Sequence, residues 1–194
     1  MYYPARCAEA INCDRRSPPP PLGATSVITV RRPNTATELD EVRALMRAFV
    51  AWHRQRHLED LNLIDEYFDP VEFEEELASL PGKYSPPGGQ LLLARYGDEP
   101  AGCVALRRID EQTCEMKRMF LYPRYHGKGI GRALGESIIQ DARAAGYAIM
   151  RLDTSVRQIE AQALYAKLGF RRIDPYYELP APLRDWLVFL ELRI

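Results

Sequence analysis

The segment RYHGKGIGRAL, residues 124–134, restricts the possible folds more than any other part of this sequence. It follows the apolar run MFLYP directly, and apolar residues then recur every four positions from Ile130 to Ala142. That spacing is typical of a helix with one buried face, and Gly146 is a suitable residue to end it. The sequence therefore predicts a strand, a glycine-rich turn and a helix in direct succession.

Three alternating glycines, Gly127, Gly129 and Gly131, stand where this helix begins. Glycine allows backbone N–H groups to approach a ligand closely, and a helix N-terminus adds unpaired N–H groups and a positive dipole end. Five cations and no acid occur between Met116 and Gly135: Lys117, Arg118, Arg124, Lys128 and Arg132. We expect a local anion site here, with a diphosphate as its natural occupant.

Two nucleotide motifs do not fit the same segment. A P-loop requires GxxxxGK[ST], for which Gly127 has no partner, and a dinucleotide fingerprint requires a third glycine where Arg132 stands. A tight turn without any ligand remains the alternative.

Composition limits the class of protein. The chain has 194 residues, 46% of them hydrophobic and 27% charged, with a net charge of −1. This charge argues against a protein that binds nucleic acid over its whole surface. No apolar run is long enough to predict a membrane span, and the N-terminus lacks the apolar core of a secretory signal, so we expect a cytoplasmic protein. The four cysteines show no metal-ligand spacing, and we expect no metal and no disulfide framework. They are Cys7, Cys13, Cys103 and Cys114.

Residues 1–26 and 27–194 differ in pattern. The first segment lacks periodicity and contains Pro18 to Pro21, so we expect a flexible Pro-rich leader, with an SH3-type ligand as the alternative. From residue 27 the pattern is regular and without repeats, which predicts one domain with the order β-α-α-β-β-β-α-β-α-β-β. The expected elements are a strand at 26–33, helices at 38–57 and 69–80, three strands within 90–123, the helix after residue 129, a strand at 147–154, a helix at 160–170 and strands at 171–177 and 186–194.

The pattern R-x-x-G-x-G, here Arg124, Gly127 and Gly129, resembles the pyrophosphate-binding motif of the GNAT superfamily of N-acetyltransferases. ALYAKLGFRRI at 163–173 is similar to the second signature of that family, at the expected separation. RLDT at 151–154 and PYY at 175–177 resemble a common bacterial subgroup. The resemblance covers residues 27–194 and implies an α/β (α+β) fold: a mixed, mostly antiparallel central sheet of about 6–7 strands flanked by about four helices.

The resemblance also implies acetyl-CoA as the acyl donor, bound in a V-shaped split between two parallel strands. The fourth strand would carry a bulge and pair with the pantetheine arm, and the main chain of 124–131 would hold the pyrophosphate. Arg124 and Lys128 would assist, with Arg132 closer to a solvated surface role, and Gln158 stands where the family often has an asparagine that touches the cofactor. The implied cofactor-binding residues are Met119, Phe120, Leu121, Arg124, Tyr125, His126, Gly127, Lys128, Gly129, Ile130, Gly131, Arg132 and Gln158.

Two residues acquire catalytic roles from the resemblance. Tyr165 would be the general acid that protonates the departing thiolate, which is sensible because a phenol has a pKa of about 10 and a thiol about 8.5. The alternative is a core tyrosine, since it lies on an apolar stripe with Leu164 and Leu168. Glu115 resembles the general base, and its alternative is a surface strand residue paired with Lys117 or Arg118.

The acceptor would be a small-molecule or peptide amine that reacts directly in a ternary complex, without a cysteine-linked intermediate. Nine carboxylates and no lysine or arginine lie between Glu59 and Glu76, which predicts either attraction of a cationic amine or a solvated helix face. Candidate pocket residues are Trp52, His53, Tyr67, Tyr176 and Tyr177. A non-catalytic acyl-CoA-binding or sensing module is the alternative function. We expect no nucleic-acid or membrane partner, and either a monomer or a homodimer.

Overall fold

A computed structural model describes residues 27–194. The predictions made for residues 1–26 lie outside the described residues.

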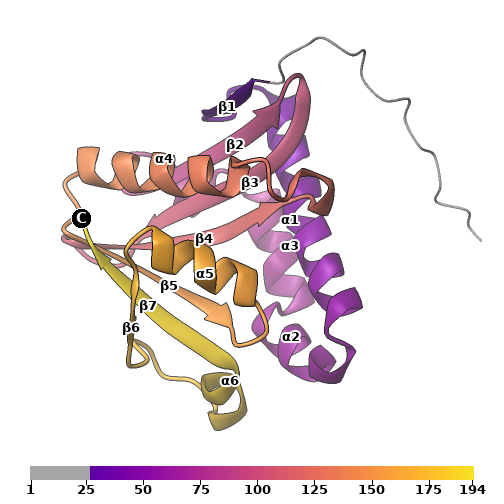
Figure 1. Cartoon of the computed structure of the whole chain (residues 1–194), viewed down its shortest axis with the longest axis vertical. Helices are drawn as coiled ribbons and strands as arrows, with labels where there is room; N and C mark the ends of the chain where they lie inside the picture. The colour runs from indigo at the N-terminus through magenta and orange to yellow at the C-terminus, as the bar shows by residue number, and fades with distance from the viewer. Residues whose placement is uncertain (1–26) are drawn as a thin grey trace, which may run out of the picture.

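The described chain is built on one seven-stranded sheet with the order β1-β2-β3-β4-β5-β7-β6 (Figure 1). All neighbouring strands are antiparallel except β4 and β5, which are parallel. The strands are β1 (Ile28–Arg31), β2 (Gln90–Tyr96), β3 (Glu99–Arg108), β4 (Thr113–Leu121), β5 (Ile149–Ser155), β6 (Arg171–Ile173) and β7 (Leu187–Arg193). The predicted mixed, mostly antiparallel sheet is confirmed.

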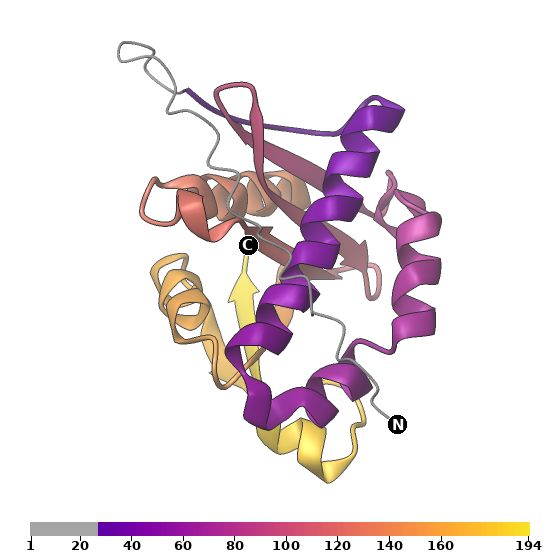
Figure 2. The same cartoon turned by 90° about the vertical axis from the view of Figure 1, so that its right-hand side faces the viewer.

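Helices cover both faces of the sheet. α4 and α5 lie on one face, and α1, α2, α3 and α6 lie on the other (Figures 1 and 2). They are α1 (Ala36–Arg56), α2 (Leu61–Tyr67), α3 (Pro70–Ala78), α4 (Ile130–Ala144), α5 (Ile159–Lys167) and α6 (Ala181–Trp186). The short helices α2 and α6 were not predicted, and the strand predicted at 171–177 ends at Ile173, two residues before a proline that has no N–H to donate.

Two of the helices, α1 and α3, begin at side-chain caps. At the start of α1, Thr35 Oγ1 accepts a hydrogen bond from the Glu38 amide at 3.2 Å. Asp69 Oδ1 accepts from the amides of Val71 and Glu72 at 2.9 and 3.0 Å, and Pro70 occupies the first turn of α3. These local signals fix the starts of α1 and α3.

A hydrophobic core lies on each face of the sheet. On the α4 face, Ile130, Leu134, Ile138 and Ala142 are fully buried, as the four-residue spacing predicts. On the other face, α1 buries Val42, Leu45 and Met46 against the sheet and the neighbouring helices. Within residues 27–194, no helix is long and apolar enough to cross a membrane.

The parallel strands β4 and β5 pair over only three positions. Residues 113–115 of β4 face residues 149–151 of β5, and beyond them the strands part. On its other side β4 carries a bulge against β3: Cys103 pairs with Phe120 and Ala105 with Lys117, so two β4 residues oppose Val104. The V-shaped split and the bulge, both implied by the family resemblance, are therefore present.

Candidate active site

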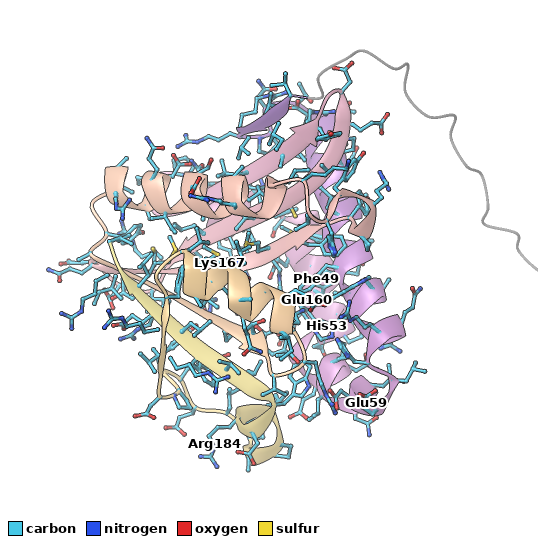
Figure 3. The ribbon with its side chains drawn as sticks, in the orientation of Figure 1. Phe49, His53, Glu59, Glu160, Lys167 and Arg184 are labelled. Atoms are coloured by element: carbon cyan, nitrogen blue, oxygen red, sulfur yellow. The ribbon has the colours of Figure 1, made fainter. Side chains whose placement is uncertain are left out.

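A cleft follows the separation of β4 and β5. It is bordered by Lys117 and Met119 from β4, Asp153 from β5, Tyr165 from α5 and His53 from α1. The C-terminal half of α1, with Phe49 and His53, lies next to the N-terminal end of α5, which carries Glu160 (Figure 3). Arg56 Nη2 donates to Glu160 Oε1 at 2.6 Å across this junction. The cleft is thus enclosed by segments from both halves of the chain.

The glycine-rich turn enters α4 with its backbone in the left-handed region. Gly127 has φ of 76° and Gly129 has φ of 84°, values that residues with a Cβ adopt rarely. Gly129 occupies the N-cap, where no side chain caps the helix, and the Ala133 amide donates to the Gly129 carbonyl at 3.0 Å. The amides of residues 130–132 precede this first helical hydrogen bond, so they are available to an anion.

Two of the predicted cations lie against aromatic rings near this turn. The Arg124 guanidinium stands 4.5 Å from the ring centre of Tyr122, and Lys128 Nζ stands 4.9 Å from that of Tyr96. Arg132 is 75% exposed and its Nε donates to Glu136 Oε1 at 2.7 Å, which agrees with the surface role expected for it. Lys117 and Arg118, by contrast, pair with the buried carboxylates of Asp153 and Glu76, so the five cations predicted for one anion site do not all serve it.

The remaining predicted turn and edge residues divide between solvent and core. His126 is exposed, whereas Tyr125 is buried and packs with Tyr96 at 5.6 Å between ring centres. On β4, Met119 borders the cleft, and Phe120 is buried with its ring 5.5 Å from that of Phe49. Leu121 packs against the core on the α4 face. Ile130 is a core residue, so only its backbone amide is available to a ligand.

Tyr165 lies both in the hydrophobic core and at the cleft, so it combines the two positions that the sequence allowed. Its side chain is buried in the core of the α4 face, with its ring 5.8 Å from that of Phe170, and it also borders the cleft. No described residue forms a hydrogen bond with its hydroxyl group. Burial raises the pKa of the Tyr165 phenol, and the negative charge of Asp153 raises it further. The phenol is therefore protonated at neutral pH.

Gln158 also borders the cleft, at the N-cap position of α5. Its Oε1 accepts a hydrogen bond from Thr154 Oγ1 at 2.6 Å. This bond occupies the amide oxygen and leaves the N–H₂ group of Gln158 as a hydrogen-bond donor available to a ligand.

Glu115 is fully buried, so the alternative of a surface strand residue was wrong. Arg107 Nε donates to its Oε2 at 2.5 Å, and the Tyr176 hydroxyl group donates to its Oε1 at 2.6 Å. Lys117 Nζ lies 3.6 Å from Oε1, but Arg118 pairs instead with Glu76 on α3. The sequence did not anticipate this burial because the covering tyrosine lies 61 residues further along the chain.

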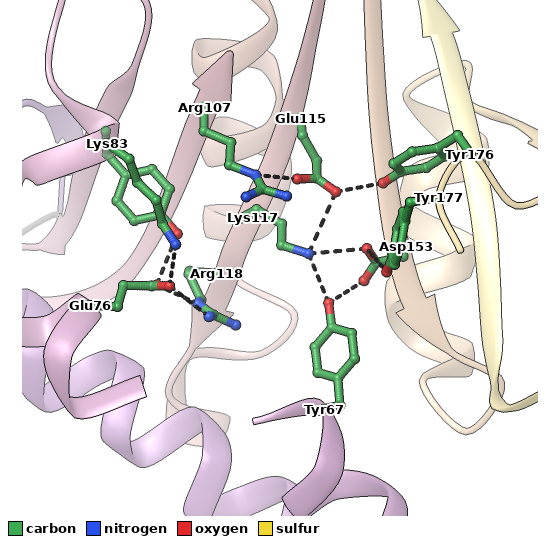
Figure 4. A network of polar contacts seen from close by, with 11 residues as sticks. Tyr67, Glu76, Lys83, Arg107, Glu115, Lys117, Arg118, Asp153, Tyr176 and Tyr177 are labelled. Atoms are coloured by element: carbon green, nitrogen blue, oxygen red, sulfur yellow. Dashed lines mark hydrogen bonds and ion pairs between the residues drawn. The ribbon is translucent and has the colours of Figure 1, made fainter. Parts of the chain in front are cut away.

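A second carboxylate, Asp153, was not recognised from the sequence as a site residue. Lys117 Nζ donates to its Oδ2 at 3.0 Å, and the hydroxyl groups of Tyr177 and Tyr67 also donate to it (Figure 4). Burial alone would raise the pKa of Asp153, but the charge of Lys117 and these hydrogen bonds lower it below its ordinary value. Asp153 borders the cleft whereas Glu115 does not. The only sequence signal was its place in RLDT, at the end of an apolar run.

The candidate acceptor residues divide into two groups. Tyr67, Tyr176 and Tyr177 all donate hydrogen bonds to the buried carboxylates. His53 borders the cleft and is 2% exposed, and Trp52 packs beside it with ring centres 6.1 Å apart.

The acidic segment, residues 59–76, has nine carboxylates. Five of them form ion pairs with cations of other elements or loops, and one caps α3. The paired carboxylates are Glu59, Asp60, Asp65, Glu74 and Glu76, and the cap is Asp69.

Among residues 27–194, no group of three or more His, Cys, Asp or Glu side chains is arranged to hold a metal ion. Cys103 and Cys114 are buried free thiols, and burial raises the pKa of both to about 12. Neither thiol is therefore ionised at neutral pH.

A sheet that opens between two parallel strands, beside a glycine-rich helix N-terminus, is the architecture of the acyl-CoA N-acyltransferases. Residues 52–170 match the acetyltransferase (GNAT) family, and the chain belongs to this family.

Relatives and solved structures agree with this family. An uncharacterised N-acetyltransferase of Schizosaccharomyces pombe is 35% identical over 159 residues, which cover 81% of this chain and 89% of the relative. An acyl-CoA N-acyltransferase structure from Klebsiella pneumoniae, named as putative, superposes with a TM-score of 0.61 at 26% identity, covering 88% of this chain and 99% of that one. The PaiA N-acetyltransferase of Thermoplasma acidophilum, solved with coenzyme A, has the same fold, with a TM-score of 0.65 at 19% identity over 87% of this chain and 99% of that one.

Proposed function

We propose that this protein is an N-acetyltransferase that transfers an acetyl group from acetyl-CoA directly to a primary amine in a ternary complex. The observation that carries the proposal is the cleft between β4 and β5. Tyr165 and Asp153 both border it. The N-terminus of α4, which no side chain caps, would offer its amides to the diphosphate of the donor. The names of the relatives, which include N-acetyltransferases from several organisms, support the same reaction class.

The donor would lie with its pyrophosphate on the amides of the turn at 127–132, and Arg124 and Lys128 would add positive charge there. Its pantetheine arm would follow the β4 edge at 119–121, and Gln158 would offer an amide donor. The thioester would then face Tyr165, whose protonated phenol would deliver a proton to the departing thiolate.

The two carboxylates have different places, and this suggests different roles. We assign the contact with the acceptor amine to Asp153, because it borders the cleft. Glu115 would act through its neighbours, holding Tyr176 and lying close to Lys117 from a position outside the cleft. Its role as the general base, which the family resemblance implied, would then pass to Asp153 or to a water held there.

Replacement of each carboxylate by the amide of the same shape tests these different roles of Asp153 and Glu115. Asp153→Asn should lower kcat/KM for the amine by about 100-fold without weakening acetyl-CoA binding, whereas Glu115→Gln should lower it by less than about tenfold. The reverse ranking would return the role to Glu115. Thermal unfolding of each variant must show that it is folded at the assay temperature.

The function itself is tested by calorimetric titration of acetyl-CoA into the purified protein, with ATP and NAD as controls. Specific binding of acetyl-CoA supports the donor site, and release of free CoA thiol with an amine panel supports turnover. Tyr165→Phe should keep the binding and lower kcat by about 10²- to 10⁴-fold. Binding without turnover for any amine would favour the alternative, a non-catalytic acyl-CoA-binding module.

The acceptor class is kept broad, as a small-molecule or peptide amine. An N-acetylaspartate synthetase of Danio rerio is 31% identical over 144 residues, and the match spans 51% of that relative. An IAA acetyltransferase of Azospirillum brasilense is 41% identical over 92 residues. These relatives carry different names, so the amine panel should include amino acids as well as other amines. A cytoplasmic location and a monomeric or homodimeric state remain proposals.

A further inference from the structure

Arg118 has an unusual backbone conformation at the bulge of β4. Its φ is +56°, and it is the only non-glycine residue of the described chain, 27–194, in the left-handed region. Residues with a Cβ populate this region roughly tenfold less than the right-handed region, because the Cβ approaches the following carbonyl group. Something in the surroundings must therefore stabilise the conformation.

The side chain of Arg118 is held firmly by α3. Its Nε and Nη2 donate to the two carboxylate oxygens of Glu76 at 2.7 and 2.9 Å (Figure 4). The guanidinium group also stands 5.2 Å from the ring centre of Phe68 and 5.3 Å from that of Phe73. The Arg118 side chain is 11% exposed and that of Glu76 is 7% exposed, so solvent screens this bidentate pair little.

Glu76 is itself fixed by two more donors. Lys83 Nζ donates to its Oε2 at 2.7 Å, and the Tyr84 hydroxyl group donates to its Oε1 at 2.9 Å. Burial alone would raise the pKa of Glu76, but the hydrogen bonds and charge of Arg118 hold it at about 2. The carboxylate is therefore ionised at neutral pH and presents a rigid anchor to β4.

The bulge determines how the next residues of β4 face the cleft. Met119 follows Arg118 directly and borders the cleft, and the Arg118 carbonyl accepts from Cys103 Sγ at 3.5 Å on the β3 side. If Arg118 left the left-handed region, the peptide between 118 and 119 would rotate, and the edge at 119–121 would present its N–H and C=O groups differently.

We propose that Glu76 is a positioning residue for the acyl donor: it holds Arg118 in the left-handed conformation and thereby shapes the β4 edge that receives acyl-CoA. This inference rests on the proposed function, because it assigns the donor to that edge. It also links α3, on the α1 face, to the donor site. The competing explanation is that the pair only fastens α3 to the sheet.

Glycine and alanine at position 118 separate the two explanations. Both remove the contact with Glu76 to the same degree, but only glycine adopts positive φ without strain. The comparison is made in a Glu76→Gln background, so that neither double variant leaves a buried unpaired carboxylate. The control is Glu74→Gln on the same helix, whose partner Arg47 is exposed and lies on α1.

Acetyl-CoA binding is measured by calorimetry, with thermal unfolding of every variant as a check on folding. E76Q should raise Kd at least threefold and R118A/E76Q about tenfold, whereas R118G/E76Q and E74Q should stay within about twofold of the wild type. Equal Kd values for R118G/E76Q and R118A/E76Q, or an unchanged Kd in E76Q, would overturn the inference.

Amide hydrogen exchange over residues 116–121, without ligand, keeps the inference separate from the proposed function. Exchange should be faster in E76Q and R118A/E76Q than in the wild type, and should return towards the wild-type rate in R118G/E76Q. A wild-type protein that does not bind acetyl-CoA contradicts the proposed function and, with it, the donor role of Glu76. Unchanged exchange in all three variants contradicts the control of the bulge by Glu76.

Discussion

Protonation of His53 should destabilise the folded protein as the pH falls below 6.5. The imidazole is 2% exposed, and its Nδ1 has no hydrogen-bond partner among the described residues. Its ring packs 5.7 Å from Phe49 and 5.7 Å from Trp186 between centres. Burial, and to a smaller extent the nearby His57, lowers the pKa of His53 from its ordinary 6.5 to about 4, against the opposite influence of Asp60.

The sign follows from the lowered pKa. The unfolded chain takes up the proton at about pH 6.5, whereas the folded protein resists it until about pH 4. The contribution of neutral His53 to stability is thus complete above pH 6.5 and is lost progressively between pH 6.5 and 4. At pH 5 the difference corresponds to about 2 kcal/mol, because one pKa unit is worth about 1.4 kcal/mol.

Urea unfolding of the wild type and of His53→Phe, at pH 7.5 and pH 5.0, measures this contribution. Phenylalanine keeps the aromatic packing but cannot be protonated, so the free energy of unfolding of the variant relative to the wild type should increase by about 2 kcal/mol at the lower pH. His57 is present in both proteins, and replacement of the exposed His126 by Phe is the control. A stability difference that is the same at both pH values would refute the reasoning.

Three further predictions concern glycines and the core. Gly129→Ala and Gly146→Ala both place a Cβ at a positive φ, of 84° and 88°, and each should lower the free energy of unfolding in urea by about 1 kcal/mol. Only Gly129→Ala should also weaken acetyl-CoA binding, and equal affinities of the two variants for acetyl-CoA would contradict the anion site. In Gly102→Ala the new Cβ would lie 2.7 Å from the Phe120 carbonyl oxygen, so we expect a loss of about 2 kcal/mol, and a loss below about 0.5 kcal/mol would show that β3 and β4 separate easily. Leu134→Ala removes a fully buried side chain of α4 and should lower the free energy of unfolding by about 2–5 kcal/mol in the same assay. A smaller loss would contradict the burial of Leu134 against the sheet.

The elements with strong local patterns could be predicted from the sequence. The apolar stripe of α4 is buried in full, and the helix begins directly after Gly129, as the glycine-rich turn predicted. The order of strands 90–121 followed from two short turns between apolar runs, because hairpins depend mostly on local sequence. These features need few long-range contacts, and the family resemblance supplied the split between β4 and β5.

The polar side of the cleft could not be predicted in the same way. The partners of Asp153 include Tyr67, 86 residues away, and Lys117, 36 residues away. Thr113, Glu115 and Lys117 alternate with apolar residues along β4, which is the pattern of a solvated face. Tyr176 and Arg107 nevertheless close over Glu115. Burial of a charged strand residue depends on which distant segment covers it. The short helices α2 and α6 were missed because helices of seven and six residues are too short for an apolar periodicity to be recognised.

The acidic segment has a different meaning once its ion pairs are known. As a run of nine carboxylates it suggested a field that attracts cationic amines, but most of that charge is used within the fold. Around the cleft three buried or nearly buried carboxylates, Glu76, Glu115 and Asp153, pair with Arg107, Lys117 and Arg118. Glu76 also pairs with Lys83, whose side chain is 46% exposed, so solvent screens the charge of this fourth cation. A compensated site of this kind attracts neither sign of charge over a distance, because the fields of opposite charges cancel beyond their own separation. Under the proposed function, an amine acceptor would therefore be selected by short-range contacts, chiefly by competing with Lys117 for the oxygens of Asp153. Shape and hydrogen bonding in the cleft would then decide the selection, and not the net charge of the helices that border it.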